Sequence, residues 1–286
     1  MTDRHVVAGI DGSRPGLAAA EWAAAEAEAR GTALRLVHVA PPEPEEQPPP
    51  RAAETWRLGA ERMVRGAVAE ITRRRPDLDV VGEQATGAPA AALAAACGSA
   101  GLLVLGTRGL GGFEGLALGS VALELAGGAS CPVVLVPAAR AGEEKEPEVV
   151  LGLDARRPAD GALRYAFETA RRRGARLRAV HAWSLPAPYA APWTPYEVLE
   201  EERGAWEDQE VQLLDDALHR WREEYPTVPV LADVRLFSPA EALVKASAGA
   251  GLVVAGRGGG PGAALGGVPH AVAHHARCPV ALVPDI

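Results

Sequence analysis

The chain contains two copies of one sequence pattern, and this internal repeat constrains its fold more than any other feature. Residues 6–38 align without a gap on residues 149–181. The matched positions include an acidic residue, a proline, an Arg-Gly pair and a histidine: Asp11 and Asp154, Pro15 and Pro158, Arg30-Gly31 and Arg173-Gly174, His38 and His181. Chance does not give this order of matches, so the chain is a duplication. We predict domains at 1–140 and 146–286, because the charged segment between them is typical of a domain boundary.

Each copy alternates strand and helix patterns. In the first copy, short apolar runs predict five strands, at Val6–Ile10, Leu34–Val39, Asp79–Gln84, Leu102–Leu105 and Val133–Val136. Helical patterns lie between them, at about Pro15–Arg30, Ala52–Arg74, Pro89–Ala96 and Ser120–Ala126. Short apolar strands separated by helices indicate crossover connections and a parallel sheet covered on both faces. The predicted class is therefore α/β, with two repeated doubly wound domains that each hold a five-stranded parallel sheet flanked by helices.

Composition narrows the range of partners. The net charge is −8 and no basic stripe is present, which argues against nucleic acid. No apolar run approaches the roughly 20 residues that span a bilayer, and no signal-peptide pattern opens the chain, so we expect a cytoplasmic protein without a membrane partner. The three cysteines are far apart and form no C-x-x-C, as expected for buried thiols in a reducing compartment. Proline-rich segments at 41–50 and 184–195 are variable loops or docking segments for a protein partner.

The candidate binding residues follow two strands of the first copy. Parallel sheets bind ligands beyond the carboxyl ends of their strands. Asp11 follows the first strand and can accept hydrogen bonds from a ribose or an adenine amino group. The segment after the fourth strand reads G-x2-G-x9-G-S, formed by Gly106, Gly109, Gly119 and Ser120. Its glycines let backbone N–H groups approach a phosphate, Ser120 adds a hydroxyl at a helix start, and Arg108 supplies a compensating charge.

This G-x2-G-x9-G-S segment, between an apolar strand and a helix that runs into Cys131-Pro-Val, resembles the ATP-binding branch of the universal stress protein family. The Asp11-Gly12-Ser13 opening and the Val-His-Val end of the second strand are similar too. The resemblance covers both copies and implies the strand order 3-2-1-4-5. It implies that Asp11 and the backbone of Val39 flank the adenosine. It also implies that ribose and phosphates are held by six further positions: Gly106, Arg108, Gly109, Gly119, Ser120 and Val121.

The resemblance further implies a stress-response regulatory protein whose cofactor is ATP, with or without Mg²⁺. Related single-domain proteins look like dimers joined through the last strand. This implies that the two copies pair within one chain through Val133–Val136 and Val280–Val283, and that a homodimer of whole chains is not required.

The second copy departs from the pattern. Its glycine loop is three residues shorter, Ser120 becomes Gly267, and Ala122 becomes Pro269, which has no N–H. The acidic residue and several glycines remain as a weaker second site: Asp154, Gly256, Gly259, Gly266 and Gly267.

No catalytic residues are predicted, because the chain has no G-x4-G-K-[ST], no nucleophile elbow and no acid and base pair near the glycine loop. The alternatives are a slow ATPase or nucleotidyl-transfer enzyme on the same site, or an interaction module that binds no nucleotide. His270 and His274 have the i,i+4 spacing of metal ligands, but we interpret them as a solvated or interface helix face. We interpret His38 and His181, which end matched strands, as structural.

Overall fold

The computed structural model describes residues 5–40, 50–98, 100–110, 117–137, 148–185, 196–258 and 264–285. They form two compact units, one holding 5–137 and the other holding 148–258 and 266–285. Most of both proline-rich segments, the link between the copies and Gly259 lie outside the described residues.

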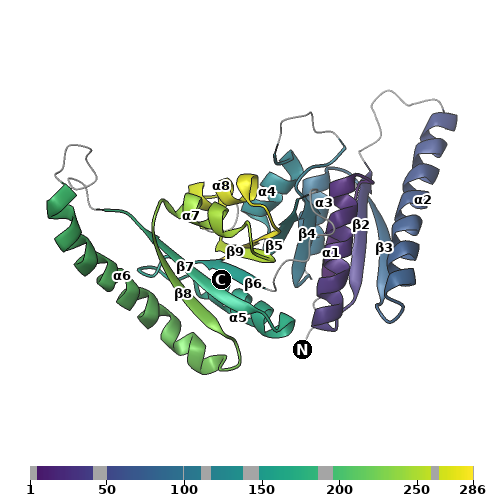
Figure 1. Ribbon diagram of the computed structural model, residues 1–286. Helices are drawn as coiled ribbons and strands as arrows, with labels where there is room; N and C mark the ends of the chain where they lie inside the picture. The colour runs from purple at the N-terminus through teal and green to yellow at the C-terminus, as the bar shows by residue number, and fades with distance from the viewer. Residues whose placement is uncertain are drawn as a thin grey trace. The chain divides into compact units, whose positions relative to one another are not determined.

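The first unit is a five-stranded parallel sheet with the order β3-β2-β1-β4-β5. Its strands are β1 (Val6–Gly9), β2 (Leu34–Ala40), β3 (Val80–Thr86), β4 (Leu102–Gly106) and β5 (Val133–Val136). Its helices are α1 (Arg14–Arg30), α2 (Pro50–Arg74), α3 (Pro89–Cys97) and α4 (Ser120–Gly128). Helices α1 and α2 contact each other, as do α3 and α4, so two helical layers cover the sheet (Figure 1). The predicted class and strand order are confirmed.

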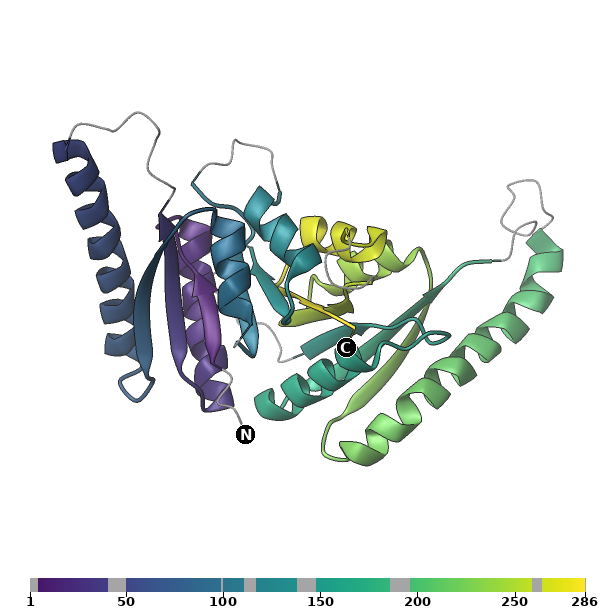
Figure 2. The same cartoon turned by 180° about the vertical axis from the view of Figure 1, so that it is seen from behind.

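The second unit repeats this arrangement with the order β8-β7-β6-β9-β10, again all parallel (Figure 2). Its strands are β6 (Glu148–Gly152), β7 (Arg176–Trp183), β8 (Val230–Leu236), β9 (Leu252–Gly256) and β10 (Val280–Val283). Its helices are α5 (Asp160–Arg173), α6 (Tyr196–Glu224), α7 (Pro239–Ala246) and α8 (Gly267–His275). Among the described residues of both units, no helix is long and apolar enough to cross a bilayer.

The core of the first unit explains its sequence pattern. The central strand β1 is apolar throughout because helices cover both of its faces, and its first three residues are fully buried. Helix α1 directs small side chains onto the sheet, at Ala19, Ala20, Ala23, Ala24 and Ala27. Small residues let the helix backbone approach β4 closely, which positions the loops at the carboxyl ends of these strands.

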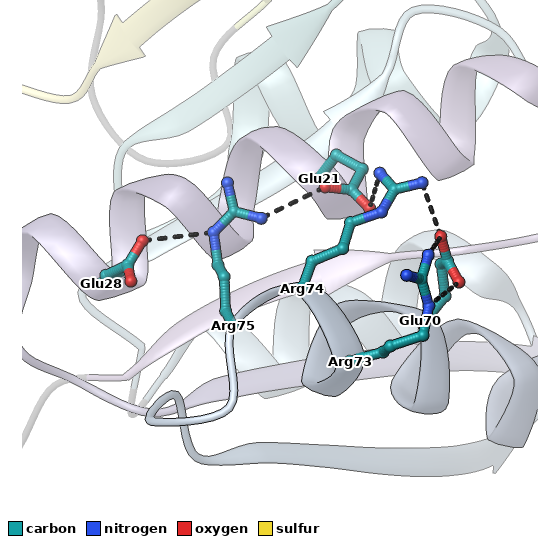
Figure 3. Close-up of polar contacts among 6 residues, drawn as sticks. All are labelled: Glu21, Glu28, Glu70, Arg73, Arg74 and Arg75. Carbon is teal, nitrogen blue, oxygen red and sulfur yellow. Dashed lines mark hydrogen bonds and ion pairs between the residues drawn. The ribbon is translucent and has the colours of Figure 1, made fainter.

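Ion pairs join the end of α2 to α1 in the first unit (Figure 3). Arg75 reaches Glu21 at 3.3 Å and Glu28 at 3.2 Å, and Arg74 reaches Glu21 at 3.0 Å. These side chains are partly exposed, so each pair contributes only about 0.2–1 kcal/mol.

The matching positions of the second unit keep one ion pair with its charges exchanged, Arg164–Glu224 at 3.7 Å, and add aromatic packing. The position of Arg75 is taken by Tyr225, which lies 5.4 Å from Phe167 between ring centroids. Arg171, which matches Glu28, lies over the Tyr225 ring at 5.5 Å. The second copy thus replaces the ion pairs of Arg75 by contacts of the Tyr225 ring and keeps the other ion pair with its charges exchanged.

Candidate functional site

The carboxylate of Asp11 joins the loops that follow β1 and β4. Its Oδ1 accepts a hydrogen bond from Ser13 N at 3.0 Å, and its Oδ2 accepts one from Leu110 N at 2.9 Å. The second bond fixes the glycine-rich loop to the end of β1, 99 residues away in the chain. Each carboxylate oxygen can accept more than one hydrogen bond. Asp11 can therefore hold the loop and still accept a donor from a ligand.

Of the three glycines of the G-x2-G-x9-G-S segment, Gly106 is required by the packing of the protein itself, and a side chain at Gly109 would displace the Asp11 carboxylate. A Cβ on Gly106 would lie 2.6 Å from the carbonyl carbon of Pro15, and a Cβ on Gly109 would lie 2.5 Å from Asp11 Oδ2. At Gly119 the nearest described atoms would be 3.7 to 3.9 Å away, which is ordinary contact. Its φ of −79° also suits any residue. Gly119 is therefore the one of these three glycines that the packing of the described residues does not require.

Helix α4 begins at this glycine without a side-chain cap. Gly119 is the N-cap, and the first helical bond runs from Leu123 N to Gly119 O at 2.9 Å. Three N–H groups precede that bond and have no acceptor within the helix: those of Ser120, Val121 and Ala122. Such groups at the positive end of a helix favour an anion. Ser120 is exposed here, and Arg108 lies close by, its Cα 3.8 Å from the Cβ position of residue 119.

Strand β2 brings backbone groups to the same edge of the sheet. Val37 O accepts a hydrogen bond from Ile10 N at 2.9 Å, and His38 donates from Nδ1 to Ile10 O at 2.9 Å. Alternate residues of a parallel strand direct their backbone groups to the same neighbour. The N–H and C=O of Val39 therefore point to the β1 side, where the chain turns away at Asp11. The structural role predicted for His38 is confirmed.

The matched residues of the second copy are arranged differently. Asp154 Oδ1 accepts from Arg156 N at 3.1 Å, and its Oδ2 faces Arg157 Nε at 3.5 Å. The Asp154–Arg156 bond is the counterpart of the Asp11–Ser13 bond, and the position that matches Leu110 lies outside the described residues. Helix α8 starts at Gly267 with Pro269 as its third residue, so one of the three free N–H groups is missing. The start of α8 therefore offers one backbone donor fewer than the start of α4.

A buried polar network at this end of the second sheet was not predicted. Glu210 of α6 is 5% exposed and accepts hydrogen bonds from Arg156, at 2.7 Å from Nη1, and from His181 Nε2 at 2.9 Å. Burial raises the pKa of Glu210, but the hydrogen bonds from Arg156 and His181 outweigh it and place that pKa below its ordinary 4.5. The second copy thus fills the region beside its first loop with an internal ion pair.

The sequence gives only a weak signal for this network. Glu210 matches Ala60, and Arg156 matches Ser13, which caps α1 by accepting from Gly16 N at 3.1 Å. Two charged residues replace small ones at matched positions 54 residues apart, and only the fold shows that they meet. The buried ring of His181 confirms its structural role.

The histidines of α8 lie against one another. The rings of His270 and His274 are 4.5 Å apart between centroids, and burial, with His270 and His275 nearby, lowers the pKa of His274. No cluster of three or more His, Cys, Asp or Glu side chains suited to a metal ion occurs within the described parts of the chain.

Comparison with known proteins agrees with the fold. A model of the universal stress protein family matches residues 3–137 and 147–284. The chain is similar to universal stress protein Rv2005c of Mycobacterium tuberculosis, at 35% identity over 96% of this chain and 95% of the relative. Universal stress protein Rv1996 of the same organism is 33% identical over 98% and 95%. A universal stress protein structure from Archaeoglobus fulgidus covers 100% of both chains with a TM-score of 0.69, and at 15% identity it supports the fold alone.

Proposed function

Because the chain belongs to the universal stress protein family, we propose that its first copy binds an adenine nucleotide at the carboxyl ends of β1 and β4. The ligand is ATP, alone or with Mg²⁺. In this proposal Asp11 and the Val39 backbone contact the adenosine. Ribose and phosphates lie against Gly106, Arg108, Gly109, Gly119, Ser120 and Val121.

The start of α4 is the observation that carries the proposal. Its N-cap has no side chain, its first N–H groups have no helical acceptor, and a Cβ on Gly119 would meet no described atom closer than 3.7 Å. Every helix start has free N–H groups, and here no side chain of the N-cap covers them. A triphosphate uses all of them, because its negative oxygens accept from the free N–H groups.

The second copy is proposed to bind nucleotide weakly or not at all, through Asp154, Gly256, Gly259, Gly266 and Gly267. Pro269 removes one donor from α8, and Gly267 stands where the first copy has the hydroxyl of Ser120. We therefore propose one tight site per chain.

The activity that fits this site is nucleotide sensing in a cytoplasmic stress-response protein, with occupancy passed to a protein partner. Asp11 binds backbone N–H groups through both oxygens, an arrangement that suits a structural carboxylate better than a general base. The rival functions are a slow ATPase or nucleotidyl-transfer enzyme, and an interaction module that binds no nucleotide.

Mass spectrometry of small molecules released from freshly purified protein tests the proposal. We expect an adenine nucleotide, and a rise in melting temperature when ATP and Mg²⁺ are added to nucleotide-free protein. Protein that carries no nucleotide and shows no thermal shift with ATP would favour the interaction module. Time-dependent formation of ADP or AMP, abolished by Ser120→Ala, would instead establish an enzyme.

A further inference from the structure

Two of the three cysteines meet inside the first copy. Cys97 is the last residue of α3, and Cys131 lies two residues before β5. Their side chains are buried, at 2% and 5% exposure, and their sulfur atoms are 2.8 Å apart. A covalent S–S bond spans about 2.05 Å, so the two thiols lie within reach of bond formation.

The second copy shows that the fold does not need this pair. The position of Cys97 is taken there by Ser247, while Cys131 is matched by Cys278. Ser247 Oγ accepts from Arg277 N at 2.9 Å and donates to Val244 O at 2.7 Å. A serine therefore makes the hydrogen bonds needed at the same helix end. The paired thiols are a particular feature of the first copy.

The surroundings of the two thiols shift their pKa values in opposite directions. The hydrogen bond from Cys131 lowers the pKa of the Cys97 thiol against the opposing effect of burial. The same contact, together with burial, raises the pKa of Cys131. Cys97 is thus the more readily ionised sulfur, and the thiolate is the form that reacts with oxidants.

We propose that Cys97 and Cys131 form a reversible disulfide on exposure to hydrogen peroxide. The Cys97 thiolate attacks one peroxide oxygen, the O–O bond breaks, and Cys97 sulfenic acid and hydroxide form. Cys97 as a sulfenic acid carries no charge, so the Cys131 thiol loses its proton and its sulfur attacks the Cys97 sulfur, which forms the S–S bond and expels a second hydroxide. The two hydroxides take up the two protons that the thiols release, so two thiols and one peroxide give one disulfide and two waters.

Burial decides which oxidants can reach the two cysteines, and their positions in the chain decide what the disulfide stabilises. Both sulfurs are nearly inaccessible, so a small peroxide reaches them more readily than a bulky disulfide does. The two cysteines are 34 residues apart and bracket β4, the glycines of the candidate site and the start of α4. The cross-link restricts the unfolded chain and therefore stabilises the first copy. A dithiol reductant reverses it.

Peptide mapping of the whole chain tests the proposal. Native protein is treated with peroxide, its remaining thiols are alkylated under denaturing conditions, and it is cut with trypsin. Arg108 lies between the two cysteines, so trypsin places them on separate peptides that only a disulfide can join. We expect this joined pair, its loss on treatment with dithiothreitol, and an alkylated Cys278 in the same sample.

Melting temperature gives the second measurement. Oxidation should raise it by several degrees in the wild type and in Cys278→Ser, but not in Cys97→Ser, which copies the serine of the second copy. Recovery of Cys97 and Cys131 as separate alkylated peptides would overturn the proposal. So would their conversion to sulfinic or sulfonic acids without a joined pair. The mapping uses wild-type protein, so its result does not depend on whether a variant folds or on nucleotide binding.

Discussion

Replacing Gly119 by valine should remove nucleotide binding and leave the fold intact. A Cβ at residue 119 meets Thr107 O at 3.7 Å and Gly109 N at 3.9 Å, so it fits the described structure without displacing it. The added methyl groups occupy the space in front of the α4 N-terminus, where the phosphates are proposed to lie. The variant also replaces a favourable N-cap residue by a poor one, which costs about 1 kcal/mol.

The expected shifts in melting temperature follow from the free energy of ATP binding and from the cost of the changed N-cap. A ligand at a hundred times its Kd adds about 2.7 kcal/mol to the stability of a protein that binds it only when folded. For a domain of this size, 1 kcal/mol shifts the melting temperature by roughly 3–4 °C, so ATP should raise that of the wild type by roughly 8–11 °C. Gly119→Val should melt roughly 3–4 °C lower without ATP and show no rise with it.

Differential scanning fluorimetry measures both values, and the second copy offers a matched control. Gly266 is the N-cap of α8, its φ is −60°, and its Cβ would meet no described atom closer than 3.5 Å. Gly266→Val should therefore carry a similar capping cost but keep the full response to ATP. The reasoning is refuted if the ATP shift survives Gly119→Val unchanged, or if Gly266→Val removes it.

Three further predictions concern the packing around the site and between the copies. Gly106→Ala should destabilise nucleotide-free protein by about 1–3 kcal/mol in urea unfolding, because the new Cβ would lie 2.6 Å from Pro15; an unchanged midpoint would contradict this. Glu210→Ala should cost about 1–3 kcal/mol at neutral pH. Because the folded state lowers the pKa of Glu210, the wild type should lose this stability as the pH falls below 4.5, and the variant should lack that loss; parallel pH profiles would refute the assignment. Pairing of the copies through their final strands stays a prediction from the sequence: Val134→Cys and Leu282→Cys, without the native cysteines, should cross-link within one chain, and failure to do so would count against it.

The fold could be predicted from the sequence because its signals are local and occur twice. Helix α1 was expected at Pro15–Arg30 and spans Arg14–Arg30, and β2 was expected at Leu34–Val39 and spans Leu34–Ala40. Apolar runs and the glycine after α1 carry this information within a few residues. The strand order rested on family resemblance, since periodicity does not distinguish one order of parallel strands from another.

The roles of the glycines could not be predicted, because they depend on contacts between distant residues. The spacing predicted that all three glycines serve a phosphate. In the structure Gly106 packs on Pro15 and Gly109 on the Asp11 carboxylate, 91 and 98 positions away in the numbering, and of the three only Gly119 could carry a Cβ with ordinary contacts to the described residues. Asp11 was expected to serve a ligand, and its bond to Leu110 N shows that it also holds the loop.

Calorimetric titration of nucleotide-free protein with ATP tests the central claim most directly. The starts of α4 and α8 predict one ATP per chain, because α4 keeps three free N–H groups and Ser120, while Pro269 and Gly267 remove a donor and a hydroxyl from the second site. A stoichiometry of one, with no second site of similar affinity, is the predicted result. Two equal sites would contradict the account of the second copy, and the absence of any binding heat over a range of temperatures would contradict the nucleotide site itself.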